Sequence, residues 1–155
     1  YVAVTFYLIT YTILALGAFA TVVLISPFSE SDKISDFKGL AQRNPWLAFL
    51  MMSFLFSFAG VPPTVGFYAK LMILKGLVDV ELTWLACVAV FFSVIGAFYY
   101  LRVIKTMYFD KPDTIDPIYI PLDARIAISV NGLAAIVFGL FPAPLFLLCQ
   151  KILGG

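Results

Sequence analysis

Long apolar stretches separated by polar segments dominate the chain. The apolar stretches cover about residues 1–25, 46–78, 84–109 and 126–149, and the two longer polar segments cover 26–45 and 110–125. Each apolar stretch is long enough for the ~20 residues that cross a hydrocarbon core of ~30 Å. We therefore expect an all-α integral membrane protein with four transmembrane helices. Pro142 and Pro144 are expected to kink the far end of the last one.

The second apolar stretch is too long for one straight span, and its middle contains helix-breaking residues. The interrupting sequence is Gly60-Val61-Pro62-Pro63-Thr64-Val65-Gly66-Phe67-Tyr68-Ala69-Lys70. Pro62 and Pro63 lack an N–H, and a proline disfavours the α conformation in the residue before it. We predict two half-helices joined by unwound backbone over residues 60–66. Such discontinuous helices form ion and substrate sites in transporters.

Composition narrows the class of protein further. The chain is 63% hydrophobic and 12% charged, with a mean hydropathy of +1.03. A net charge of +1 gives no electrostatic basis for binding nucleic acid. There is no histidine, and Cys87 and Cys149 are expected to be small buried hydrophobes, so no metal site is predicted. Because Tyr1 lies inside an apolar stretch and is not preceded by Met, we expect a piece of a longer polytopic protein.

The distribution of cations predicts an orientation. Segments 26–45 and 110–125 lie on one side, and most cations belong to them or to their flanks: Lys33, Lys38, Arg43, Arg102, Lys105, Lys111 and Arg125. The positive-inside rule places this side in the cytoplasm, with residues 79–81 and both chain ends opposite. Arg102 and Lys105 are interpreted as interface anchors, with a functional role as the alternative.

Lys70 is the candidate functional residue. It lies about 13–14 Å along its helix from Asp79 at ~1.5 Å per residue, close to the middle of a ~30 Å core. A charge at this depth costs about 2.5–3.5 kcal/mol on insertion scales, so a functional site is the first hypothesis. We expect its ammonium to lean over Gly66 toward the break and to meet free carbonyls of the first half-helix. The alternative is a structural lysine that is permanently paired or snorkels outward.

Residues 60–70 resemble the broken-helix motif of the antiporter-like subunits of respiratory complex I, most closely those of the subunit N type. Supporting matches are Leu16-Gly17-Ala18-Phe19, Lys38-Gly39-Leu40, Ile95-Gly96-Ala97-Phe98-Tyr99-Tyr100-Leu101-Arg102-Val103 and Met107-Tyr108. The resemblance covers essentially the whole chain. It implies the last four helices of a fourteen-helix antiporter-like bundle, in a bacterial plasma membrane or an equivalent energy-transducing inner membrane.

The resemblance also implies a function. Lys70 would transfer protons near the outer end of a line of charged residues, coupled to quinone reduction by NADH. Gly60, Pro62, Pro63 and Gly66 would form the helix break, and Thr64 and Tyr68 are candidates for holding water or for packing. The partners would be other membrane-arm subunits of complex I, lipid, protons and water. NADH, FMN, iron–sulfur clusters and quinone would bind to other subunits.

Two alternatives stay open. The chain could belong to a multisubunit cation/proton antiporter, because those proteins share the fold and a similar motif. It could also be a purely structural bundle in which Lys70 is always paired.

Overall fold

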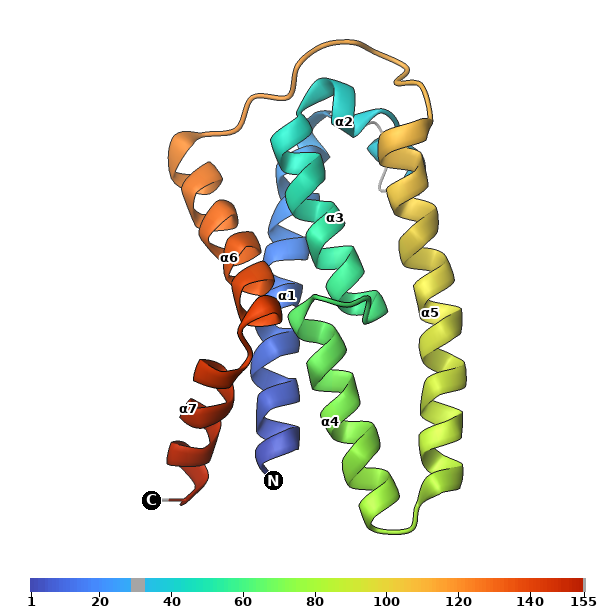
Figure 1. Ribbon diagram of the computed structural model, residues 1–155. Helices are drawn as coiled ribbons and strands as arrows, with labels where there is room; N and C mark the ends of the chain where they lie inside the picture. The colour runs from blue at the N-terminus through green and yellow to red at the C-terminus, as the bar shows by residue number, and fades with distance from the viewer. Residues whose placement is uncertain (29–32, 155) are drawn as a thin grey trace.

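The computed structural model describes residues 1–28 and 33–154, and these are mostly α-helical with no strand among them (Figure 1). The elements in chain order are α1 (Val2–Ile25), η1 (Ser26–Phe28), η2 (Ile34–Phe37), α2 (Leu40–Arg43), α3 (Pro45–Ala59), α4 (Val65–Asp79), α5 (Thr83–Phe109), α6 (Leu122–Leu140) and α7 (Ala143–Gly154). The expected all-helical class is confirmed for the described part of the chain.

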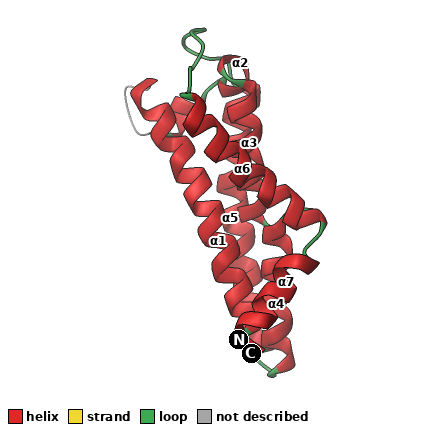
Figure 2. Ribbon diagram, turned by 90° about the vertical axis from the view of Figure 1, so that its left-hand side faces the viewer, coloured by secondary structure: helices red, strands yellow, loops and turns green. Residues whose placement is uncertain are grey.

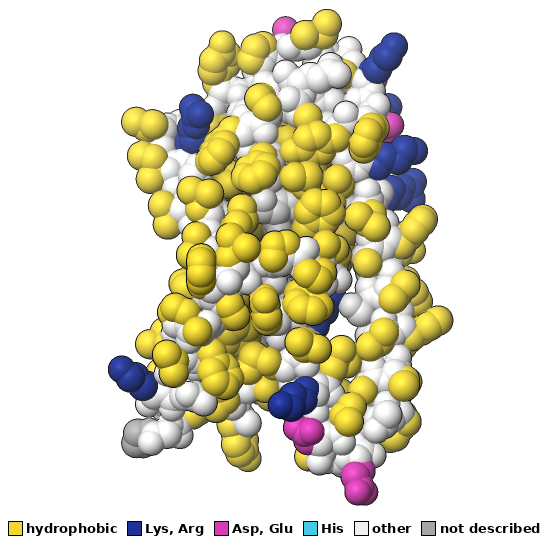
Figure 3. Space-filling model, viewed as in Figure 1, with side chains coloured by type: hydrophobic (Ala, Val, Ile, Leu, Met, Phe, Trp, Pro, Cys, Tyr) yellow, Lys and Arg dark blue, Asp and Glu magenta, His cyan; other side chains and the backbone are white. Residues whose placement is uncertain are grey.

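The helices run roughly lengthwise through an elongated bundle (Figures 1 and 2). Both chain ends and the α4–α5 turn lie at one end, and α2 with the long α5–α6 connection lies at the other. The helices α1, α5 and α6 are long and apolar enough to cross a membrane. Figure 3 shows apolar side chains over the middle of the molecule and charged side chains mainly near its two ends. The chain is a multi-pass membrane protein.

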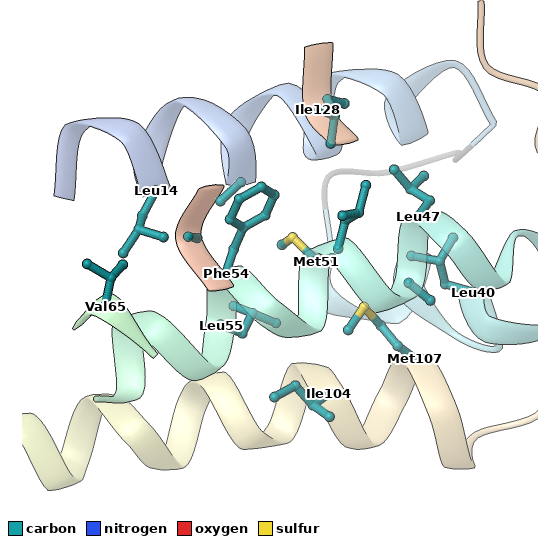
Figure 4. Packing of buried hydrophobic residues seen from close by; sticks show 14 of the residues in the cluster. Leu14, Leu40, Leu47, Met51, Phe54, Leu55, Val65, Ile104, Met107 and Ile128 are labelled. Carbon is teal, nitrogen blue, oxygen red and sulfur yellow. The ribbon is translucent and has the colours of Figure 1, made fainter. Parts of the chain in front are cut away.

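Helix α3 occupies the centre of the core, where it contacts α1, α5 and α6 (Figure 4). Phe54 of α3 is completely buried, and its ring lies where a side chain at Gly17 of α1 would stand. Leu50 of α3 lies in the same way against Gly132 of α6. Small residues on α1 and α6 therefore let these helices approach α3 closely, as is common between membrane helices.

The break expected near residues 60–66 appears as non-helical backbone between Ala59 and Val65. Gly60 has φ +80°, a left-handed conformation that glycine adopts without steric cost. Gly60 N–H donates to the Phe56 and Ser57 carbonyls, and Val61 N–H also donates to Phe56. This Schellman arrangement ends α3. The Pro62–Pro63 peptide bond is cis, and α4 begins two residues after Pro63.

The last apolar stretch differs from the sequence-based expectation. We expected one helix over 126–149 with a kink at its far end, but α6 ends at Leu140 and a separate α7 begins at Ala143. Phe141, which precedes Pro142, has φ −129° and ψ 78°. A proline ring disfavours the α conformation in the residue before it, so the helix stops where only a bend was predicted.

The polar connections fold over one end of the bundle. Residues 110–121 are non-helical, and Arg43 Nε and Asn44 Nδ2 donate to the Asp116 and Ile118 carbonyls, at 3.0 and 2.9 Å. Trp46 Nε1 donates to Ser129 Oγ at 2.8 Å, which ties the start of α3 to α6. Of the predicted loop 26–45, residues 29–32 lie outside the described part of the chain.

The contact between Gly66 and the end of α3 gives a first prediction. A Cβ at Gly66 would collide with the backbone carbonyl of Ser57, whereas a Cβ at Gly76, also in α4, would meet nothing within 4 Å. Gly66→Ala should destabilise the fold by about 1–3 kcal/mol, because rigid backbone has to move. Gly76→Ala should be neutral or stabilising by up to ~1 kcal/mol. Thermal unfolding of the full assembly carrying each variant measures the difference, and equal midpoints would contradict the packing described here.

Candidate functional site

Lys70 lies in the second turn of α4, and its half-buried side chain points to the end of α3. Its Nζ donates to the Phe58 carbonyl at 2.6 Å, to the Ala59 carbonyl at 3.3 Å and to Ser93 Oγ of α5 at 2.7 Å. A protonated lysine has three donors and no acceptor. The site therefore offers one acceptor for each N–H of the charged amine.

The carbonyl partners of Lys70 follow from how α3 ends. The last four carbonyls of an α-helix have no partner within the helix. In α3, the Schellman turn at Gly60 satisfies the carbonyls of Phe56 and Ser57, and Lys70 satisfies those of Phe58 and Ala59. The position also suits a cation electrostatically, because the C-terminal end of a helix carries partial negative charge. The expected contact with free carbonyls of the first half-helix is confirmed.

A cavity of about 610 Å³ opens beside the ammonium, between α1, α4, α5 and the end of α3. Figure 3 shows the hollow between α4 and α5, with a cationic side chain at its edge. Most of its wall is apolar or glycine, and the lining residues with polar side chains are Tyr7, Tyr11, Lys70, Ser93 and Tyr100. The rings of Tyr7 and Tyr11 stack with centroids 4.2 Å apart. The cavity is large enough for several waters beside Lys70.

We expected the Lys70 side chain to lie over Gly66, but in the structure it lies against Gly60. Gly60 lies against the lysine stem, because a Cβ there would stand 3.0 Å from Lys70 Cδ. Gly66 instead lies against the Ser57 carbonyl. The bare backbone beside Lys70 is thus that of Gly60, while Gly66 lets α4 pack onto the end of α3.

The other predicted site residues lie apart from the cavity wall. Pro62 and Pro63 form the non-helical link, and Thr64 Oγ1 donates to the Val61 carbonyl within it at 2.6 Å. Tyr68 packs against the hydrophobic core. Arg102 and Lys105 are exposed in the last turns of α5.

Sequence reasoning missed Ser93 and the tyrosines of the cavity. Ser93 lies in the middle of the apolar helix α5. The turn at residues 80–82 is nearly equidistant along the chain from Lys70 and from Ser93. Because α4 and α5 run antiparallel from this turn (Figure 1), equal separation places the two side chains at one depth. The equal separation of Lys70 and Ser93 from the turn could therefore have predicted their contact from the sequence.

The site can hold and release a proton on an amine. Its partners are carbonyls and a hydroxyl, and among the described residues no carboxylate forms an ion pair with Lys70. No group of three or more potential metal-ligating side chains occurs in the described part of the chain.

Known proteins are similar to this chain in sequence. A sequence-family model described as "NADH:quinone oxidoreductase/Mrp antiporter, TM" matches residues 1–96. NADH-quinone oxidoreductase subunit N of Thiobacillus denitrificans is 50% identical over 155 residues, covering 99% of this chain and 32% of that protein. The corresponding protein of Nitrosomonas europaea is 54% identical over 138 residues, covering 88% of this chain and 29% of that protein.

A solved structure shares the arrangement of helices. A chain of respiratory complex I from Thermus thermophilus with bound aureothin superposes with a TM-score of 0.80 at 25% identity, covering 94% of this chain and 33% of that one. The chain spans about a third of the length of the curated relatives that it matches. The sequence and the fold thus agree, and the chain belongs to the NADH:quinone oxidoreductase/Mrp antiporter membrane family, within which it is similar to subunit N of bacterial NADH-quinone oxidoreductases.

Proposed function

We propose that the chain is part of the membrane arm of a bacterial NADH:quinone oxidoreductase, where Lys70 transfers protons toward the outer face of the plasma membrane during quinone reduction. The observation that carries the proposal is the Lys70 ammonium, held in a helix break by three neutral acceptors beside a cavity. Relatives named as subunit N, at 50 to 54% identity, support the choice of enzyme.

In this proposal four spans cross the membrane. Helices α3 and α4 are each 15 residues long, about 22 Å at ~1.5 Å per residue, and either alone is shorter than a ~30 Å core. Together they cover the length of α1, as do α6 and α7 (Figure 1). We assign α3 with α4 to one discontinuous span, and α6 with α7 to another. The end that carries α2 faces the cytoplasm, and the α4–α5 turn faces outward.

The proposed cycle alternates the charge of Lys70. Redox-driven changes in other subunits alter the charge and hydration of the buried axis, and Lys70 receives a proton from it. The amine then releases the proton toward the outer face. The cavity beside the amine, which is large enough for several waters, supports this exchange. The neutral partners allow both charge states without a buried counter-ion.

The remaining components of the enzyme belong to other subunits. NADH, FMN, iron–sulfur clusters and quinone bind elsewhere in the assembly, and this chain supplies proton transfer. Other membrane-arm helices and lipid cover its apolar surface, of which α5 exposes a large share. The partners are therefore membrane-arm subunits, lipid, protons and water.

Two other functions have specific support. The matching family includes Mrp antiporters, so a subunit of a cation/proton antiporter is the second candidate. The third is a structural role, because Lys70 caps α3 by satisfying two of its terminal carbonyls. An unsatisfied carbonyl in the membrane is costly, so this capping would stabilise the bundle by itself.

Lys70→Arg separates proton transfer from capping. Arginine keeps the charge and the donors, but it is not deprotonated in proteins. The complex should assemble, whereas NADH:quinone electron transfer and coupled proton uptake should fall by about 10²-fold, the lower end of the contribution of a proton-transfer group. Both rates are measured in sealed vesicles that contain the intact assembly.

Lys75→Met is the matched control, because Lys75 lies in the same helix but is exposed, and it should leave both rates unchanged. Lys70→Met removes both the proton and the cap, so it should lower the rates and also weaken assembly. Wild-type rates in assembled Lys70→Arg would make Lys70 structural. A parent assembly that exchanges cations for protons and oxidises no NADH would establish the antiporter function instead.

Gly60→Ala tests whether the geometry of the break matters for proton transfer. Alanine at φ +80° is strained by ~1–2 kcal/mol, and its Cβ would stand 3.0 Å from Lys70 Cδ. Proton uptake should fall by up to about tenfold, the change in rate that this energy produces. The measurement is the rate of proton uptake in the same vesicles, with Gly76→Ala as the control. Unchanged uptake in Gly60→Ala would show that the lysine position tolerates displacement.

A further inference from the structure

The three partners of Lys70 are not equivalent. The Phe58 and Ala59 carbonyls only accept hydrogen bonds, while the Ser93 hydroxyl both accepts and donates, because its hydrogen rotates about the C–O bond. A charged lysine needs three acceptors. A neutral lysine has two donors and one lone pair, and that lone pair needs a donor. Ser93 is the one partner among these three that suits both states of the amine.

Ser93 also stands where the amine meets the cavity. Lys70 and Ser93 both line the space of about 610 Å³. Three tyrosines also bring hydroxyls to its wall, but Ser93 is the lining hydroxyl that the Lys70 ammonium is hydrogen-bonded to, at 2.7 Å. The other two partners, the backbone carbonyls of Phe58 and Ala59, also belong to residues of the wall, but a carbonyl oxygen has no proton to pass on. A proton that leaves Lys70 for the cavity through a hydrogen-bonded group therefore has Ser93 as its direct route.

We propose that the Ser93 hydroxyl is the proton relay between Lys70 and the cavity. This inference rests on the proposed function and adds a residue to it. On release, an N–H bond of the Lys70 ammonium breaks as an O–H bond forms at Ser93 Oγ, while the original Ser93 proton passes to a water in the cavity. Lys70 becomes neutral, that water becomes hydronium, and Ser93 is again a hydroxyl, now donating to the amine. Loading runs through the same steps in reverse.

Ser93→Ala and Ser93→Thr in the intact assembly test the relay. Ser93→Ala removes the hydroxyl, so proton uptake and coupled electron transfer in sealed vesicles should become slower by about tenfold or more. This is the change in rate that corresponds to the loss of one hydrogen bond to a charged group. Ser93→Thr keeps the hydroxyl and should retain most of both rates. Ser53→Ala is the matched control, because its hydroxyl donates to the Phe49 carbonyl of its own helix at 2.9 Å.

A solvent isotope effect distinguishes a relay from a packing role. Deuterated water should slow Ser93→Ala more than the parent assembly, because proton transfer from Lys70 then limits turnover. If Ser93→Ala assembles poorly, Ser93→Cys serves the same test, since a thiol is a weak donor and acceptor, and it should show the same loss.

The outcomes separate the two proposals. Wild-type rates in Ser93→Ala or Ser93→Cys, alongside defective Lys70→Arg, would overturn the relay and leave the function of Lys70 intact. An equal loss in Ser93→Ala and Ser93→Thr with an unchanged isotope effect would show that Ser93 only packs. Wild-type rates in Lys70→Arg would remove both proposals together.

Discussion

The structure depends on hydrogen-bond donors for the backbone carbonyls at the end of α3, in a helix bundle that crosses a membrane. Unsatisfied backbone groups are costly in lipid, where no water replaces them. The turn at Gly60 satisfies two of these carbonyls, and the Lys70 ammonium satisfies the other two. The dependence is mutual, because a lysine at this depth also needs acceptors. A helix break and a half-buried lysine, each unfavourable alone, stabilise one another when they lie a few ångströms apart.

Neighbouring elements are shaped to fit this contact. Gly66 lets α4 begin against the Ser57 carbonyl, and Gly139 of α6 lies against the backbone of Pro63 and Thr64 in the break. A side chain at Gly66 would force α4 away from the end of α3, and one at Gly139 would force α6 away from the break. On the remaining side, α5 brings Ser93 within 2.7 Å of the ammonium. The cavity lies where α5 stands away from α1 and α4, so the same packing that fixes the lysine leaves space beside it.

Features that depend on local chemistry could be predicted from the sequence, and features that depend on neighbouring helices could not. Proline chemistry located the break, and the apolar stretches located the long helices. The contact of Lys70 with free carbonyls followed from its position just after the break. The stop at Phe141 was predicted only as a kink, because a proline in an apolar helix permits either outcome. The separate roles of Gly60 and Gly66 were missed, since each depends on what another helix places there. Ser93 was missed because one serine in an apolar helix is a weak signal without its antiparallel neighbour.

In the proposed function, the neutrality of its partners is what suits Lys70 to carrying protons. A lysine that is paired with a buried carboxylate resists losing its proton, because deprotonation leaves an uncompensated anion in a region of low dielectric. Carbonyls and a hydroxyl stabilise the ammonium through their dipoles, and they carry no net charge once it becomes neutral. Removing the proton therefore breaks hydrogen bonds without leaving a buried anion behind. The charge of Lys70 is then open to control by groups at a distance, which is the property that the proposed coupling to a remote redox reaction requires.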